Sequence, residues 1–107
     1  MAHIIKIKPL SVNEVWQGKR FKTPAYKKYE SVVLLMLPKI KLPEPPFRLN
    51  ITYGFSNSAS DIDNPTKPLL DIMQKKYGFN DSQVHELNLK KVKVKKGEDY
   101  FKFEILS

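Results

Sequence analysis

The stretch that organises this chain is Asp61-Ile62-Asp63-Asn64-Pro65-Thr66-Lys67, with two carboxylates directly before a proline-marked helix start. In an extended backbone the side chains of Asp61 and Asp63 point to the same face, roughly 6.5 Å apart along the strand. Oxygen ligands at that spacing suit one hard cation. Asn64-Pro65 predicts an N-cap followed by proline at the first helical position. The stretch therefore predicts a metal site at the entrance of a helix.

Two helices are expected. The first follows the cap-and-proline pair Thr23-Pro24 and ends before Pro38. The second follows Asn64-Pro65, keeps Pro68 in its first turn, and ends at Gly78. Apolar residues recur at helical spacing in both segments, so each helix is predicted to bury one stripe. The stripes are Tyr26, Tyr29, Val32, Val33, Met36 and Leu37 in the first helix, and Leu69, Leu70, Met73 and Tyr77 in the second.

Alternating apolar residues predict the strands 3–8 and 47–53, with Phe47, Leu49, Ile51 and Tyr53 facing the core. A closing hairpin is expected from residues 84–95 and 99–106, turning at Lys96-Gly97-Glu98, with Phe101, Phe103 and Ile105 inward. Its first strand changes phase at Lys90-Lys91, which predicts a β-bulge there. The expected fold is one α+β domain over residues 1–107, in the order β-α-β-α-β-β. Two helices should pack on a mainly antiparallel mixed sheet.

Composition narrows the class of protein. The 107 residues carry 19 Lys and Arg against 11 Asp and Glu, for a net charge of +8, which points to nucleic acid as the partner. A basic protein without such a partner is the plainer alternative. Cysteine is absent, which excludes disulfides and thiolate zinc sites, and only two histidines are present. No membrane span or signal peptide is predicted, and a reducing cytoplasm is the expected compartment.

Basic residues in the first half of the chain are the candidate DNA contacts. Residues 1–50 hold ten basic and three acidic side chains, whereas residues 51–80 hold three of each. The alternative interpretation of Lys27 and Lys28 is that they simply face water on the helix, and that of Trp16 is that it covers an edge of the core. The tryptophan could instead stack on a base or sugar. The candidates are Lys19, Arg20, Lys22 and Trp16 in the loop before the first helix, and Lys27 and Lys28 on that helix.

A third carboxylate, Asp81, completes a set suited to Mg²⁺, because this ion takes a few carboxylates and keeps several waters. The helix between the two segments is expected to return the chain so that Asp81 faces Asp61 and Asp63. Lys67 would stabilise charge on the reacting phosphate. Asp71 either orients Lys67 across one helical turn or is a plain surface acid. A helix-dipole role explains Asp63 but leaves Asp61 and Lys67 unexplained. A calcium loop of the EF-hand kind is excluded, because the glycine and the terminal glutamate that it requires are missing from this stretch at their spacing.

At these residues the chain resembles the RusA family of Holliday junction resolvases, endonucleases common in bacteria and their prophages. Residues 61–71 are similar to the family pattern Asp-(Leu/Ile)-Asp-Asn-x-x-Lys-x-x-x-Asp, and residues 79–84 to aromatic-x-Asp-(Asp/Ala/Ser)-Gln-Val, with matching separation. The closing strands are also similar, and residues 9–22 match more loosely. One departure is that Asn57-Ser58-Ala59-Ser60 stands where family members often carry basic residues. Junction affinity or sequence preference is expected to differ accordingly, unless Lys19, Arg20, Lys27 and Lys28 compensate.

The resemblance implies that Asp61, Asp63 and Asp81 are catalytic, metal-binding carboxylates and that Lys67 is important for cleavage. It implies Mg²⁺ as cofactor, with Mn²⁺ as the alternative ion, and a homodimer that makes paired nicks in four-way DNA junctions and related branched DNA. Two-fold symmetry would supply the two sites that two nicks require. Two other functions stay open at this point. One is a catalytically inactive or accessory nucleic-acid-binding module of the same fold, and the other is a small metal-binding interaction protein.

Overall fold

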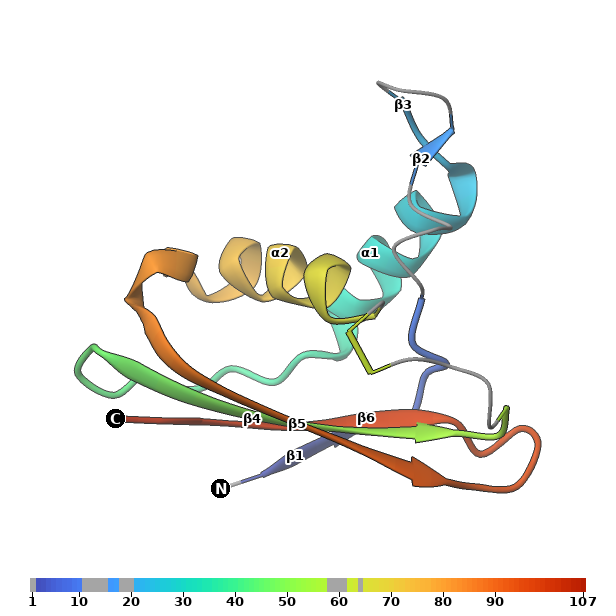
Figure 1. The fold of residues 1–107 in the computed structure, drawn as a ribbon. Helices are drawn as coiled ribbons and strands as arrows, with labels where there is room; N and C mark the ends of the chain where they lie inside the picture. The colour runs from blue at the N-terminus through green and yellow to red at the C-terminus, as the bar shows by residue number, and fades with distance from the viewer. Residues whose placement is uncertain (1, 11–15, 18–20, 58–61, 64) are drawn as a thin grey trace.

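The computed structural model describes residues 2–10, 16–17, 21–57, 62–63 and 65–107 (Figure 1). Two helices, one 3₁₀ turn and six strands alternate along the described chain. In order they are β1 (His3–Ile5), β2 (Trp16–Gln17), β3 (Phe21–Lys22), α1 (Pro24–Met36), β4 (Phe47–Phe55), α2 (Thr66–Tyr77), η2 (Asp81–Gln83), β5 (Val84–Lys93) and β6 (Tyr100–Leu106).

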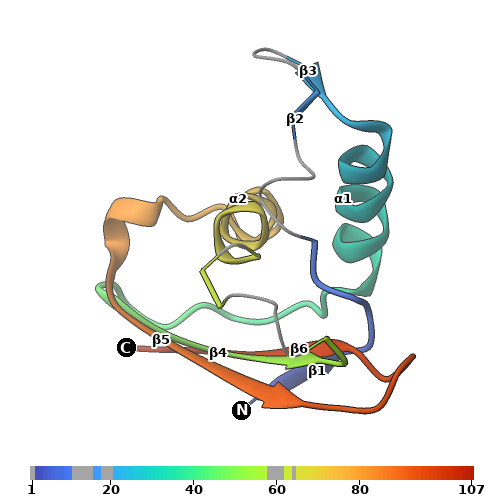
Figure 2. The ribbon, with the colours of Figure 1, turned by 45° about the vertical axis from the view of Figure 1, so that its right-hand side comes forward.

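Four strands form the main sheet in the order β1-β6-β4-β5, and the short strands β2 and β3 pair separately. β4 runs parallel to β5, whereas β6 is antiparallel to both β4 and β1. Both helices lie on one side of the sheet, as the two views of Figures 1 and 2 show, and the other side is left open. The predicted α+β class, with two helices on a mainly antiparallel mixed sheet, is confirmed.

The predicted closing hairpin is wrong, because β4 lies between β5 and β6 and pairs with both. Alternation of apolar residues identifies a strand but does not identify the strand beside it. Residues 94–99 span the intervening strand, a distance of about 10 Å for two strand spacings. Six residues span that distance easily. The length of the connection is therefore compatible both with a tight hairpin turn and with a crossing over the end of β4.

The predicted bulge at Lys90-Lys91 is also wrong, since the β4–β5 register runs unbroken through both residues. The register shifts instead between Phe47 and Arg48, so that His85 is the extra residue of β5. The valine that suggested the phase change, Val92, pairs with Gly54 on the face away from the helices. Tyr100 pairs with Gly54 from the other side, and its ring occupies the space that a Cβ would need. An apolar residue therefore fits the open face at this position without a bulge.

Local sequence signals fix both helices as predicted. The Oγ1 atom of Thr23 accepts a hydrogen bond of 3.1 Å from the Tyr26 N–H, and Pro24 is the first residue of α1. Helix α2 ends at Gly78, which adopts φ 71°, a left-handed conformation that glycine reaches without strain. Its N-cap position is occupied by Pro65, one residue later than expected, and Asn64 lies outside the described residues.

The core lies between the helices and the covered face of the sheet. The predicted inward positions of β4 and the two phenylalanines of β6 are buried, and Ile105 is half-buried. Burial of these side chains supplies most of the driving force that holds the helices on the sheet. No helix in the described ranges is long and apolar enough to cross a membrane. The fully buried side chains include Tyr26, Val33, Leu49, Ile51, Tyr53, Leu69, Ile72, Met73, Phe101 and Phe103.

Candidate active site

The start of α2 is tied to the sheet by two linked hydrogen bonds, one buried and one partly buried. The Tyr53 hydroxyl, on β4, lies 2.7 Å from the Thr66 Oγ1 atom, at the first residue of α2. Thr66 donates its single hydroxyl hydrogen to the Ile62 carbonyl at 2.8 Å, so Tyr53 must be the donor to Thr66. Burial raises the pKa of Tyr53 far above its ordinary value, which keeps this donor protonated. The backbone just before Asp63 is therefore anchored to the core.

Asp63 follows this anchored position and is itself exposed. Its backbone carbonyl accepts a hydrogen bond of 3.1 Å from the Thr66 N–H. Only main-chain atoms are used in that bond, so it orients the residue without engaging the carboxylate. Asp61, the other carboxylate of the predicted pair, lies outside the described residues.

Lys67 and Asp71 form an ion pair on the outer face of α2. The Lys67 Nζ atom lies 3.2 Å from the Asp71 Oδ1 atom, with the side chains 63% and 40% exposed. A pair this exposed contributes little to stability, so its main consequence is to restrain the lysine head. The ion pair shows that Asp71 can contact Lys67 across one helical turn, and it is compatible with both roles considered for Asp71.

The segment after α2 holds Asp81 by its backbone. The Asp81 N–H donates to the Gln74 Oε1 atom at 2.9 Å, and Asp81 begins the 3₁₀ turn η2. Asn80 and Gln83 form a reciprocal capping box around this turn. The Asn80 Oδ1 atom accepts a hydrogen bond of 3.0 Å from the Ser82 N–H, and the Gln83 Oε1 atom accepts one of 2.9 Å from the Asn80 N–H. The Asp81 side chain is exposed. Its carboxylate takes no part in these bonds.

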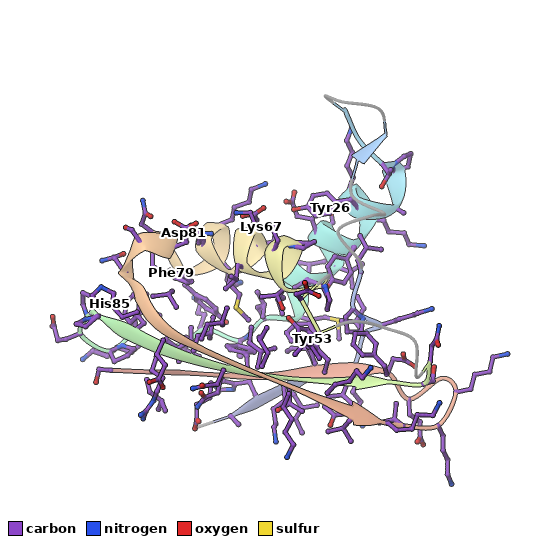
Figure 3. All side chains as sticks on the ribbon, viewed as in Figure 1. Tyr26, Tyr53, Lys67, Phe79, Asp81 and His85 are labelled. Carbon is purple, nitrogen blue, oxygen red and sulfur yellow. The ribbon has the colours of Figure 1, made fainter. Side chains whose placement is uncertain are left out.

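Asp63 precedes α2 and Asp81 follows it, which corrects the expectation that the helix returns Asp81 to face the pair. Figure 3 shows Asp81 beyond the end of α2 that lies away from Lys67. A helix of twelve residues is about 18 Å long. The sheet gives the same result: Thr66 bonds to Tyr53, whereas Phe79, beside Asp81, packs on Phe47 with ring centroids 5.6 Å apart. Six residues of strand separate those two contacts, roughly 20 Å.

This separation bears on the expected magnesium site. Within the described residues, no three His, Cys, Asp or Glu side chains lie close enough together to hold one metal ion. Ligand oxygens must all approach Mg²⁺ to about 2.1 Å, a distance that Asp63 and Asp81 of one chain do not meet. The described carboxylates of a single chain thus do not fit a shared metal.

The predicted DNA-contact residues are only partly described. Lys27 and Lys28 are exposed on α1, as the sequence predicted for residues off the apolar stripe. Trp16 and Lys22 lie in β2 and β3, which pair with each other beyond the start of α1 (Figure 1). Lys19 and Arg20 lie outside the described residues.

The sequence matches the family described as Endodeoxyribonuclease RusA over residues 9–99. That match covers most of the chain and includes every carboxylate discussed above. The chain belongs to the RusA family. This family consists of endonucleases that act on Holliday junction DNA, which places the chain among DNA-acting hydrolases of recombination. A comparison with curated proteins found no match.

Sequence reasoning missed the residues that position the RusA-type carboxylates. Tyr53 was predicted only as a core residue. The alternation of apolar residues along a strand indicates burial, but it does not show that the Tyr53 hydroxyl bonds to the first residue of α2. Thr66 offered a weak signal, being a hydroxyl residue at a helix entrance. Asn80 and Gln83 have the three-residue spacing of a capping box, which a search for caps would have found.

Proposed function

We propose that this RusA-family chain is a homodimeric, Mg²⁺-dependent endonuclease that resolves four-way DNA junctions by paired symmetric nicks. The observation that carries the proposal is that backbone hydrogen bonds fix Asp63 and Asp81 while both carboxylates stay exposed. Neither carboxylate is used by the hydrogen bonds that hold its segment, whereas a site for phosphodiester cleavage requires carboxylates held toward solvent. The cytoplasm, where the DNA substrate lies, is the compartment proposed.

Lys67 and the start of α2 supply the positive charge in this proposal. The Lys67 ammonium is exposed and restrained by Asp71, so it remains accessible to a phosphate oxygen. The aligned peptide dipoles of α2 add partial positive charge at its start, in the same region. Both groups favour the extra negative charge of a phosphate under attack. This arrangement supports the proposed roles of Lys67 in cleavage and of Asp71 as the residue that positions it.

A second copy of the chain would bring the separated carboxylates together. If two α2 helices run antiparallel about a two-fold axis, the start of one helix lies beside the end of the other. Asp63 of one protomer, with Asp61, would then face Asp81 of the partner subunit, and symmetry would repeat the site. The two sites would lie about one helix length apart, roughly 18 Å. Hard carboxylate oxygens are the ligands that Mg²⁺ or Mn²⁺ prefers, and a bound ion would polarise the scissile phosphate.

Cleavage of a synthetic four-way junction tests the proposed function. The reaction is run with Mg²⁺, with Mn²⁺ and with neither, beside a linear duplex of the same sequence. We expect metal-dependent nicks at symmetric positions in two strands of like polarity, and no nicks in the duplex. Junction binding without nicks under either metal would contradict the proposal and favour a binding module of the same fold.

A further inference from the structure

Five lysines gather where β4 leaves the sheet. Two adjoining hollows share Ser56 and Lys96 there: one is lined further by Lys93 and Lys95, the other by Lys6 and Lys8. All five side chains are exposed. We call Lys6, Lys8, Lys93, Lys95 and Lys96 the lysine corner. None of these five lysines is among the DNA-contact candidates predicted from the sequence.

The backbone of the corner is held from two sides. The Ser56 N–H donates to the Asp99 Oδ2 atom at 3.1 Å, and the Ser56 carbonyl accepts from the Lys93 Nζ atom at 2.6 Å. The Val94 N–H also donates to the Phe55 carbonyl at 3.0 Å. These bonds fasten the connection between β5 and β6 across the end of β4, at the same end of the sheet in both ribbon views (Figures 1 and 2). Lys95 and Lys96 therefore project from a fixed crossing.

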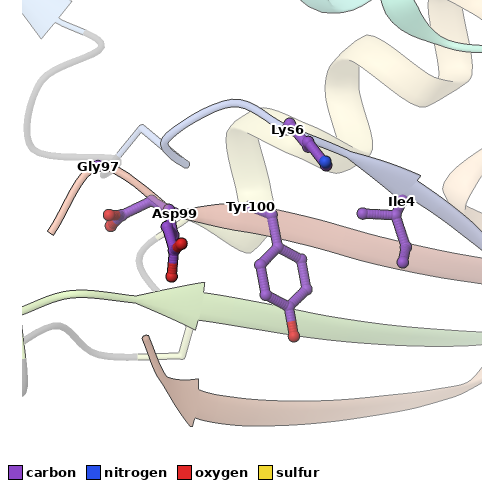
Figure 4. A pocket seen from close by; sticks show the side chains of 6 residues that line it. Ile4, Lys6, Gly97, Asp99 and Tyr100 are labelled. Carbon is purple, nitrogen blue, oxygen red and sulfur yellow. The ribbon is translucent and has the colours of Figure 1, made fainter. Parts of the chain in front are cut away.

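The charge of the corner is not cancelled locally. Glu98 and Asp99 are the acids that line these hollows, against five lysines, and Asp99 is already engaged with Ser56. The ion pairs between described residues are Arg48–Glu86, Lys67–Asp71 and Lys75–Glu30, and none uses a corner lysine. A third hollow continues the surface onto the open face of the sheet, where Lys6 and Asp99 lie beside Tyr100 and Ile4 (Figure 4). Concentrated, uncompensated positive charge suits a polyanion.

The corner is also close to the catalytic stretch along the chain. Ser56 precedes Asp61 by five residues, which span at most about 17 Å when fully extended. Duplex DNA advances 3.4 Å per base pair, so this reach corresponds to about five base pairs. A duplex arm with its scissile phosphate at Asp61 and Asp63 would thus have phosphates within reach of the corner.

From this placement we infer that the lysine corner binds the phosphate backbone of one duplex arm of the junction, within about five base pairs of the cut. The contact is electrostatic and independent of base sequence, because lysine ammonium groups reach phosphates as point charges. This inference rests on DNA as the substrate and adds the surface that holds an arm beside the carboxylates.

Salt dependence of junction binding tests the inference with two matched double variants. Lys95→Gln with Lys96→Gln removes two charges from the corner. Lys39→Gln with Lys41→Gln removes two exposed lysines from the connector before β4. Each phosphate contact contributes about 0.9 to the magnitude of the slope of log affinity against log salt, so the corner variant should reduce that magnitude by about 1.8 for each corner of the dimer that contacts DNA. At 0.1 M salt this corresponds to an affinity loss of up to roughly 60-fold for each such corner.

The control variant is expected to keep the wild-type slope, and thermal melting should show both variants folded, since all four lysines are exposed. Equal slopes for the wild type and both variants would overturn the inference. Equal losses for both variants would overturn it as well, because they would indicate diffuse charge rather than a defined surface. Failure of the wild-type protein to bind or cut a junction would instead contradict the proposed function, so the two failures are distinguishable.

Discussion

The two ends of α2 present exposed carboxylates but are held in different ways. At the start, Thr66 links the Ile62 carbonyl to the buried hydroxyl of Tyr53, so the anchor is fixed to the core at its Tyr53 end. At the end, Asp81 is held by Gln74 and by a capping box whose groups are exposed or half-buried. Both anchors use backbone atoms of the acidic segments and leave the carboxylates outward.

The comparison shows that α2 is a spacer of fixed length between the two acidic segments. A helix packed on a sheet through Leu69, Ile72 and Met73 cannot shorten, so one chain keeps its described carboxylates apart. Completing a metal site then depends on which groups lie beside each end of α2.

The largest effect is expected from removing either carboxylate charge. Asp63→Asn and Asp81→Asn should each lower the rate of junction cleavage at least about a hundredfold, more than the loss of an outer-shell partner of a metal ligand. Junction affinity should change little, since neither acid contributes favourably to phosphate binding. Gel-shift and cleavage assays on the same preparations separate the two. Glu44→Gln, an exposed acid on the connector before β4, is the matched control. A large loss of binding in either Asn variant would indicate a structural role instead.

Alkaline pH should destabilise both ends of α2 through their tyrosines. Burial raises the pKa of Tyr77, whose hydroxyl bonds to the Pro38 carbonyl at 2.7 Å, to about 12, and raises that of Tyr53 further. An unfolded tyrosine ionises near pH 10, so above that pH the unfolded state binds fewer protons than the native state. The free energy of unfolding should therefore fall as pH rises from about 10 to 12. Absorbance of tyrosinate during an alkaline titration measures this, and early ionisation without unfolding would contradict it.

Breaking the buried anchor should cost more stability than weakening the exposed cap. Thr66→Val leaves the Tyr53 hydroxyl and the Ile62 carbonyl without their partner, an expected loss of about 1 to 3 kcal/mol in the free energy of unfolding. Thr66→Ser keeps the hydroxyl and is the control. Asn80→Ala, at the other end, should cost about 1 kcal/mol. Urea unfolding of the three variants checks the order of these stability losses. An equal loss of stability for Thr66→Val and Thr66→Ser would show that the hydrogen bonds from Tyr53 through Thr66 to Ile62 contribute nothing.

The smallest effect is expected from the ion pair on the helix between the two ends. Asp71→Asn should change the free energy of unfolding by no more than about 0.5 kcal/mol, because the pair with Lys67 is exposed. Its effect should appear in cleavage, as a lower rate at unchanged junction affinity. A stability loss well above that value would mean that the pair is a structural element.

Much of the fold could be predicted from the sequence because the signals were local. The Thr23 cap, the Pro24 start and the glycine after α2 act through neighbouring backbone atoms, and the alternation in β4 reports burial directly. Strand pairing depends on residues far apart in the chain, so the position of β4 between β5 and β6 could not be predicted from the sequence. Val92 suggested a bulge only because a pattern of apolar residues cannot distinguish the covered face from a site beside Gly54 on the open face.

The residues of the candidate site stay a prediction from the sequence, and their geometry could not be predicted. The spacing of acids around Lys67 pointed to these carboxylates, and all of them lie within the range that matches the RusA family. Their positions depend on the length of α2 and on which part of β4 each end contacts. Tyr53 and Phe47 set those contacts, and both were visible in the sequence only as core residues.

The central claim is that the two ends of α2 complete each other between protomers, and mixing two inactive variants tests it most directly. Asp63→Asn and Asp81→Asn proteins are unfolded, refolded together and assayed on a four-way junction with Mg²⁺. If each site takes Asp63 from one chain and Asp81 from its partner, the mixed dimer has one intact site and should make single nicks that neither variant makes alone. Continued inactivity of the mixture, alongside an active wild-type protein treated identically, would show that each site is built within one chain.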